Sequence, residues 1–131
     1  MVVVPDGVRE ALAEHARTEE PNEACGLVVF RDGVAERYEA GTNQLASPYR
    51  FELKPADPAT LFLEDDGFEL GLFHSHVSAP AKPSKTDVEN AREDWPNRPF
   101  LIYSLAADEL AAFRISPEGH VEALPLATSQ P

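Results

Sequence analysis

Cysteine is almost absent from this chain of 131 residues, because Cys25 is the only one. A single cysteine excludes an intramolecular disulfide, which favours a reducing compartment, so we expect a cytoplasmic protein. Long hydrophobic runs are also missing. The apolar start, MVVV, is interrupted at Pro5 and is too short for a signal peptide. No stretch approaches the roughly 20 apolar residues of a membrane span, so we expect no membrane segment.

Positive charge is scarce as well. The chain has 11 Lys and Arg residues against 23 Asp and Glu residues, which gives a formal net charge of −12. A surface of this charge repels phosphate backbones and anionic lipids, so nucleic acid and membrane surfaces are poor partners. The acidic residues are spread along the chain. We therefore interpret them as promoting solubility and not as an acidic tail.

Repeats and low-complexity linkers are missing too, so we expect a single domain over residues 1–131. A hydrophobic content of 43% is enough for a sizeable core. Periodicity and turn residues predict helices and strands that alternate along the chain, and hence an α/β fold with a mixed sheet flanked by helices. The expected helices cover 6–19, 58–67 and 84–95, and the expected strands cover 24–30, 34–39, 49–53, 68–76, 100–106, 109–115 and 120–126.

The segment HSHVSAPAKPSKTD, residues 74–87, contains candidate metal ligands. His74 and His76 lie at the end of an expected strand, where side chains two residues apart point to the same face. Zinc accepts neutral imidazole together with carboxylate, and a catalytic zinc ion typically has three protein ligands and an open position. Asp87 is the candidate third ligand, since the proline-containing loop allows the chain to return to the strand end.

Two other interpretations of this segment stay open at this point. Two histidines at a strand end are more often partly exposed side chains than ligands. Ser84-Lys85-Thr86-Asp87 also matches a capping box, in which Ser84 caps a helix and Asp87 reaches back to its amide. We expect the metal and capping roles of Asp87 to be mutually exclusive, because a zinc-bound carboxylate would not also reach the Ser84 amide.

Glu23, at the start of the first buried strand, bears on this choice. A zinc hydrolase needs a carboxylate outside the metal shell that moves a proton from water to the leaving amine. A lone glutamate is ordinarily a solvated charge, but here the order and spacing are specific. Glu23 followed by H-S-H, seven residues, S, two residues and D resembles the JAMM (MPN-plus) metalloprotease signature, E…H-[S/T]-H-x7-S-x2-D.

The resemblance implies a single-domain MPN fold, which is cytidine-deaminase-like, and one zinc ion per chain. It implies that His74, His76 and Asp87 bind the zinc, that Glu23 is the general acid/base, and that Ser84 donates a hydrogen bond to the developing oxyanion. Ser75, between the histidines, is expected to face away from the metal in a structural role. The sequence departs from many relatives at Val77, where they have proline, and we expect an altered loop there.

The sequence around these residues is similar to that of the small prokaryotic members, in the segments E-A-C-G-L, G-L-F-H-S-H and P-S-K-T-D. Their resemblance implies a peptidase that hydrolyses the amide bond after the C-terminal glycines of a ubiquitin-like sulfur-carrier protein, releasing cysteine or a C-terminal extension. The alternatives are an isopeptidase that removes ubiquitin-like modifiers from lysines, and an inactive MPN scaffold for protein assembly. The carrier, the residue after the scissile bond and the oligomeric state, including a homodimer, stay open.

Cys25 and the segment 43–51 are further candidates for a role at the site. Cys25 lies two residues from Glu23, but no base is assigned to it, so we expect a buried small residue rather than a nucleophile. Asn43, Ser47-Pro48 and Phe51 belong to a segment that also resembles the prokaryotic members, and we expect them near the substrate groove.

Overall fold

The structure is a computed structural model, and it describes residues 1–129. Its helices are α1 (Asp6–Glu19), the 3-10 helix η1 (Pro58–Asp66) and α2 (Lys85–Asp94). Its strands are β1 (Val2–Val3), β2 (Cys25–Arg31), β3 (Val34–Ala40), β4 (Thr42–Asn43), β5 (Leu53–Lys54), β6 (Glu69–His76), β7 (Phe100–Ser104), β8 (Glu109–Ile115), β9 (Val121–Leu124) and β10 (Leu126–Ala127). The alternation of helices and strands agrees with the predicted α/β class.

Eight of the strands form one mixed sheet in the order β10-β1-β3-β2-β6-β7-β8-β9. The pair β6–β7 and the pairs of β1 are parallel, whereas the remaining neighbours are antiparallel. The predicted continuous strand over 120–126 is wrong, because it is divided at Pro125 into β9 and β10, which pair at opposite ends of the sheet. Proline has no N–H to donate, but the Pro125 carbonyl accepts from the Val2 amide at 3.0 Å.

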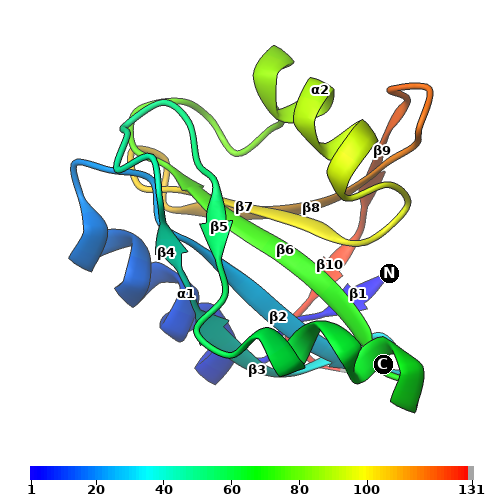
Figure 1. Cartoon of the computed structure of the whole chain (residues 1–131). Coiled ribbons are helices and arrows are strands. Elements are labelled where there is room, and N and C mark those ends of the chain that lie inside the picture. Colours follow the sequence, from blue (N-terminus) through cyan, green and yellow to red (C-terminus); the bar gives the residue numbers. More distant parts are fainter. Residues whose placement is uncertain (130–131) are drawn as a thin grey trace.

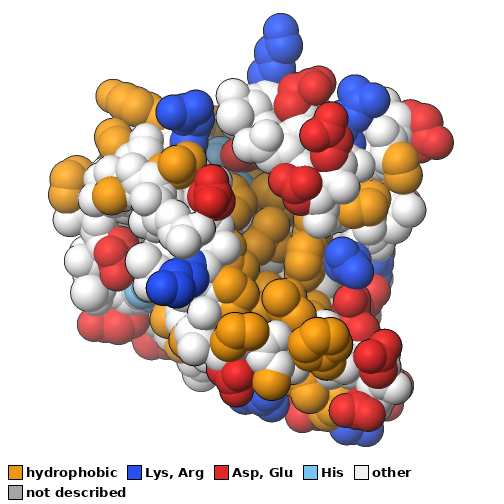
Figure 2. Space-filling model, in the orientation of Figure 1, with side chains coloured by type: hydrophobic (Ala, Val, Ile, Leu, Met, Phe, Trp, Pro, Cys, Tyr) orange, Lys and Arg blue, Asp and Glu red, His pale blue; other side chains and the backbone are white. Residues whose placement is uncertain are grey.

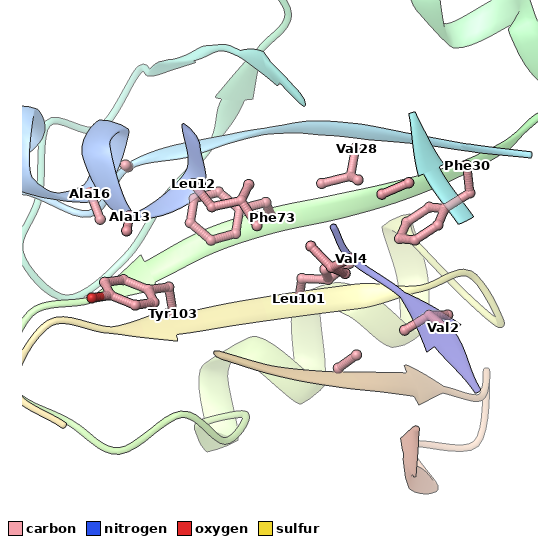
Figure 3. Close-up of a cluster of buried hydrophobic side chains, with 13 residues drawn as sticks. Val2, Val4, Leu12, Ala13, Ala16, Val28, Phe30, Phe73, Leu101 and Tyr103 are labelled. Atoms are coloured by element: carbon pink, nitrogen blue, oxygen red, sulfur yellow. The ribbon is translucent and has the colours of Figure 1, made fainter. Parts of the chain in front are cut away.

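The sheet is covered on both faces (Figure 1). Helix α1 packs on one face, where Leu12, Ala13 and Ala16 join a buried cluster with Phe73 and other sheet residues (Figure 3). Residues of α2 and η1 pack on the other face, against a second cluster that includes Leu70 and Leu72. Alternation along β6 therefore assigns its even-numbered residues to the α2 face and its odd-numbered residues to the α1 face.

The predicted strand over 49–53 is also wrong. Residues 49–52 form no strand, and only Leu53 and Lys54 pair with β4, which was not predicted. The reason lies in the Asn43 side chain, which hydrogen-bonds the backbone of Leu45, Arg50 and Glu52 and so replaces a strand ladder with a side-chain-organised loop. An alternating sequence pattern carries no information about such a contact.

The short helix η1 follows the predicted end signals. Asp57 Oδ1 accepts a hydrogen bond from the Ala59 amide at 3.0 Å, and Pro58 occupies the first turn. Gly67 ends the helix with φ 87°, a conformation that favours glycine. None of the helices among residues 1–129 is both long and apolar enough to cross a membrane.

Gly26 in β2 is required by close approach of β3. A Cβ atom at this position would lie 2.5 Å from the Glu39 carbonyl oxygen. This oxygen belongs to the backbone of β3, so relieving the clash would require the strand to shift. We predict that Gly26→Ala lowers the free energy of unfolding by about 2 kcal/mol or more, as measured by urea denaturation. Gly7→Ala is the control, because nothing lies within 4 Å of its added Cβ. Equal stability of the two variants would contradict this account of β2 and β3.

Candidate active site

Two buried histidines lie at the carboxyl end of β6, between the neighbouring strands β2 and β7. Their side chains share the α2 face of the sheet, and their Nε2 atoms are 3.0 Å apart. His74 is paired with Cys25 on one side and Ile102 on the other, so its backbone is fixed by two strands. The β-strand spacing thus brings both imidazoles to one point, as the sequence predicts.

Asp87, in the first turn of α2, completes a triangle of potential ligand atoms. Its Oδ2 lies 3.2 Å from His74 Nε2 and 3.0 Å from His76 Nε2. Tetrahedral zinc with bonds of about 2.0–2.1 Å places its ligand atoms about 3.3 Å apart. The three atoms therefore match the size and chemistry of a zinc site, and His74, His76 and Asp87 are the residues that could hold the ion.

The capping box at the start of α2 is also present. The Ser84 amide donates to Asp87 Oδ2 at 2.9 Å, and the Asp87 amide donates to Ser84 Oγ at 3.0 Å. The same carboxylate oxygen, Asp87 Oδ2, faces the Ser84 amide and both histidines, so the capping contact does not turn the carboxylate away from them. A carboxylate oxygen has more than one lone-pair site. The hydrogen bond from the Ser84 amide therefore orients the Asp87 carboxylate and still leaves it able to contact the histidines.

The two imidazoles are oriented in different ways. His76 Nδ1 donates to the Pro80 carbonyl at 2.8 Å, which fixes the ring with its Nε2 directed toward Asp87. His74 Nδ1 has no hydrogen-bond partner within residues 1–129. Instead, the His74 ring stacks on Phe51 at a centroid distance of 4.5 Å and meets the edge of Phe100 at 5.1 Å.

Burial and hydrogen bonding set the protonation of these three groups. Burial lowers the pKa of His74 despite its contact with Asp87. For His76, burial also acts to lower the pKa, but the hydrogen bonds with Asp87 and the Pro80 carbonyl prevail and raise it. Burial opposes ionisation of Asp87, yet its hydrogen bonds to His74, His76 and the Ser84 amide hold the pKa well below the usual range. The site thus contains a permanent carboxylate.

Glu23 lies just before β2 and is 4% exposed. One of its carboxylate oxygens and one nitrogen from each histidine all lie within 4.8 Å of one another. Its Oε1 has no hydrogen-bond partner within the described part of the chain. Burial raises the pKa of Glu23 to about 8, although His76 acts in the opposite direction. Glu23 is therefore adjacent to the triangle, as predicted, and can exchange a proton near neutral pH.

The remaining sequence candidates occupy distinct places. Ser84 is exposed at the helix start, beside Asp87. Ser75 points to the α1 face, where its Oγ accepts from the Ala24 amide at 2.8 Å and fixes the residue next to Glu23. Cys25 is fully buried, and burial raises the pKa of its thiol to about 12, which disfavours a nucleophilic thiolate.

A groove of about 480 Å³ leads to Asp87 between α2 and residues 45–55. Its walls are mostly apolar, and Figure 2 shows it as a hollow lined with hydrophobic side chains. Phe51 lines the groove, as expected from the sequence. Its stacking on His74 was not predicted, because Phe51 was assigned to a strand and no sequence pattern pairs residues 51 and 74.

Comparison with known proteins identifies the family. The family model described as prokaryotic homologues of the JAB domain matches residues 5–116. The chain belongs to this family. The match confirms the resemblance that the E…H-S-H…S…D pattern indicates, and with it the predicted fold class.

Individual relatives are similar over most of their length. The CysO-cysteine peptidase of Mycobacterium tuberculosis is 31% identical over 123 residues, covering 88% of this chain and 83% of the relative. The desampylase of Haloferax volcanii is 33% identical over 107 residues, covering 73% of this chain and 75% of the relative. A solution structure of a Desulfitobacterium hafniense protein is 33% identical, with a TM-score of 0.78 over 96% of this chain and 91% of that one.

The triangle of ligand atoms predicts metal binding that depends on His76. We expect purified protein to contain about one zinc ion per chain, measured by elemental analysis, and His76→Ala to lose it because one of three ligands is removed. His120→Ala is the matched control, since His120 is exposed and distant in sequence from the triangle. Zinc retention by His76→Ala, or its loss from both variants, would contradict the assignment.

The raised pKa of Glu23 predicts a pH-dependent stability of the metal-free protein. A carboxyl group with a folded-state pKa of about 8 against an ordinary 4.5 binds more protons in the folded state between these values, so stability falls as the pH rises through this window. Glu23→Gln does not titrate and should lose less stability between pH 5 and pH 8, by on the order of 2 kcal/mol. The measurement is urea unfolding with a chelator present.

Glu118→Gln, at an exposed turn, is the control for this measurement and should follow the wild type. A Glu23→Gln variant with the pH dependence of the wild type would show that Glu23 ionises freely in the folded protein.

Proposed function

We propose that this JAB-family protein is a zinc-dependent peptidase that hydrolyses the amide bond after the C-terminal glycines of a ubiquitin-like sulfur-carrier protein. The observation that carries the proposal is the convergence of His74, His76 and Asp87 within 3.2 Å, with the buried carboxyl group of Glu23 adjacent. The name of the CysO-cysteine peptidase supports the choice of substrate class.

In this proposal, His74, His76 and Asp87 hold the zinc ion, which supplies Lewis acidity and a water molecule of lowered pKa. Glu23 lies outside that ligand set and acts as general acid/base. Its carboxylate accepts a proton from the attacking water and returns it to the leaving amine. A group with a pKa near the working pH performs both transfers efficiently, and burial gives Glu23 a pKa of about 8.

Ser84 is the proposed donor to the oxygen of the scissile carbonyl. Its Oγ accepts from the Asp87 amide, which fixes the side chain while leaving its hydroxyl proton free to donate outward. The capping box therefore positions the third metal ligand and the oxyanion donor together. Donors of this kind contribute about 3 kcal/mol in well-characterised hydrolases.

The groove suits an extended peptide tail that ends at the metal site. Its apolar lining can bury backbone and small side chains, and the short strand β5 on its edge can pair with an added strand. Asp94 of α2 lines this groove, and Figure 2 shows acidic side chains beside the hollow. Charge complementarity therefore favours a carrier whose tail is flanked by basic residues.

The decisive experiment incubates the protein with ubiquitin-like carriers that bear a cysteine or a short peptide after their C-terminal glycines, and measures cleavage by mass spectrometry. We predict that Glu23→Gln retains zinc but loses at least about 100-fold in turnover, because proton transfer is lost. Cys25→Ala is the control and should retain both, since the thiol takes no part.

Cleavage by metal-free wild-type protein would overturn the mechanism, and full turnover by Glu23→Gln would remove Glu23 from its role. A lysine-linked carrier conjugate belongs in the same assay, because the Haloferax relative is named a desampylase. Preferential cleavage of that conjugate would favour the isopeptidase alternative. An absence of cleavage with zinc bound would favour the scaffold alternative.

A further inference from the structure

The two histidines of the triangle differ in how their outer faces are supported. Metal-ligating histidines ordinarily donate their second ring nitrogen to a carboxylate, carbonyl or water, which fixes the ring. His76 follows this pattern through the Pro80 carbonyl. His74 does not, because its Nδ1 is buried without a hydrogen-bond partner in residues 1–129. The contacts that the structure does give the His74 ring are aromatic.

Phe51 supplies one of these contacts. Its ring lies nearly parallel to the His74 imidazole, with an interplanar angle of 18° and a centroid distance of 4.5 Å. Phe100 meets the same imidazole edge-on at 88°, so the two phenyl rings restrict it from two directions. Phe100 belongs to the sheet, next to β6, whereas Phe51 belongs to a loop. The orientation of His74 thus depends on a loop residue.

Asn43 fixes the loop that carries Phe51. Its Nδ2 donates to the carbonyls of Glu23 and Arg50, at 3.1 and 3.0 Å. Its Oδ1 accepts from the amides of Leu45 and Glu52, each at 3.1 Å. These bonds use the hydrogen-bonding capacity of the amide and hold the chain on both sides of Phe51.

The same loop is bonded to the backbone of the proposed acid/base. The Glu23 amide donates to the Ser47 carbonyl at 2.8 Å, and the Glu23 carbonyl accepts from Asn43. Residues 43–51 therefore contact Glu23 through hydrogen bonds and His74 through an aromatic ring. A displacement of this loop would affect both groups.

We propose that Phe51 is a positioning residue, which holds the metal ligand His74 by ring stacking in place of a hydrogen bond, and that Asn43 sets its position. The proposal rests on the metal site of the proposed function. It assigns Phe51 a role in metal affinity that is separate from its contact with the groove.

The test measures zinc affinity by competition with a chromophoric chelator, without substrate. Phe51→Leu removes the flat ring and should weaken zinc binding about 10-fold, the lower end of the effect of losing an outer partner of a ligating histidine. Phe51→Tyr keeps the ring and should stay within about threefold of the wild type. The absorption bands of the Co²⁺-loaded protein should shift in Phe51→Leu alone, because the ligand geometry changes.

Phe68→Leu is the matched control. Phe68 is half-buried against the same apolar cluster as Phe51, but its ring contacts Arg31 instead of the histidines. It should lose comparable stability in thermal unfolding and keep its zinc affinity. Unchanged affinity in Phe51→Leu, or an equal loss in Phe68→Leu, would overturn the inference while leaving the zinc site intact. A wild type that binds no zinc would overturn the proposed function as well.

The role of Asn43 is tested by a double-mutant cycle in the same assay. Asn43→Ala should weaken zinc binding, because the loop loses four hydrogen bonds. If Asn43 acts on His74 through Phe51, the Asn43→Ala/Phe51→Leu variant should bind zinc about as well as the weaker single variant. Additive losses would show that Asn43 acts by another route and would overturn this step.

Discussion

The site depends on one carboxylate oxygen, Oδ2 of Asp87. It lies 2.9 Å from the Ser84 amide and 3.0–3.2 Å from Nε2 of His76 and His74. The start of α2 and the end of β6 meet at this atom, although they are joined by a loop of eight residues, 77–84. The negative charge is buried at low cost because each of its neighbours is a hydrogen-bond donor or a potential ligand of the same ion.

The surrounding fold holds the partners of this atom on rigid elements. Strand β6 is an interior strand, and the alternation of its side chains directs His74 and His76 to the α2 face while Ser75 fixes Ala24 on the other face. Apolar clusters on both faces prevent the strand from shifting. Two irregular segments add support: the Pro80 carbonyl accepts from His76, and the loop 43–51 contacts both Glu23 and His74.

The sequence predicted what depends on local order. The two-residue period placed both histidines on one face, the S-x-x-D spacing placed the start of α2, and Asp57, Pro58 and Gly67 placed η1. It could not predict contacts made at long range by single side chains. Asn43 replaced an expected strand with a loop, Pro125 divided another between two sheet edges, and Phe51 met His74. A sequence motif also does not specify which oxygen, or how many partners, a carboxylate uses, so it does not reveal that the capping oxygen of Asp87 also faces both histidines.

Two acidic side chains in one small site show how environment divides chemical roles. Asp87 is surrounded by donors, which hold its pKa far below the usual range and keep it anionic. Glu23 is equally hidden from solvent, but its Oε1 lacks a donor within the described residues, and burial raises its pKa to about 8. A permanently charged carboxylate suits a metal ligand, whereas one that exchanges its proton near neutral pH suits a general acid/base. The hydrogen bonds around each group, rather than its chemical type, therefore assign the role.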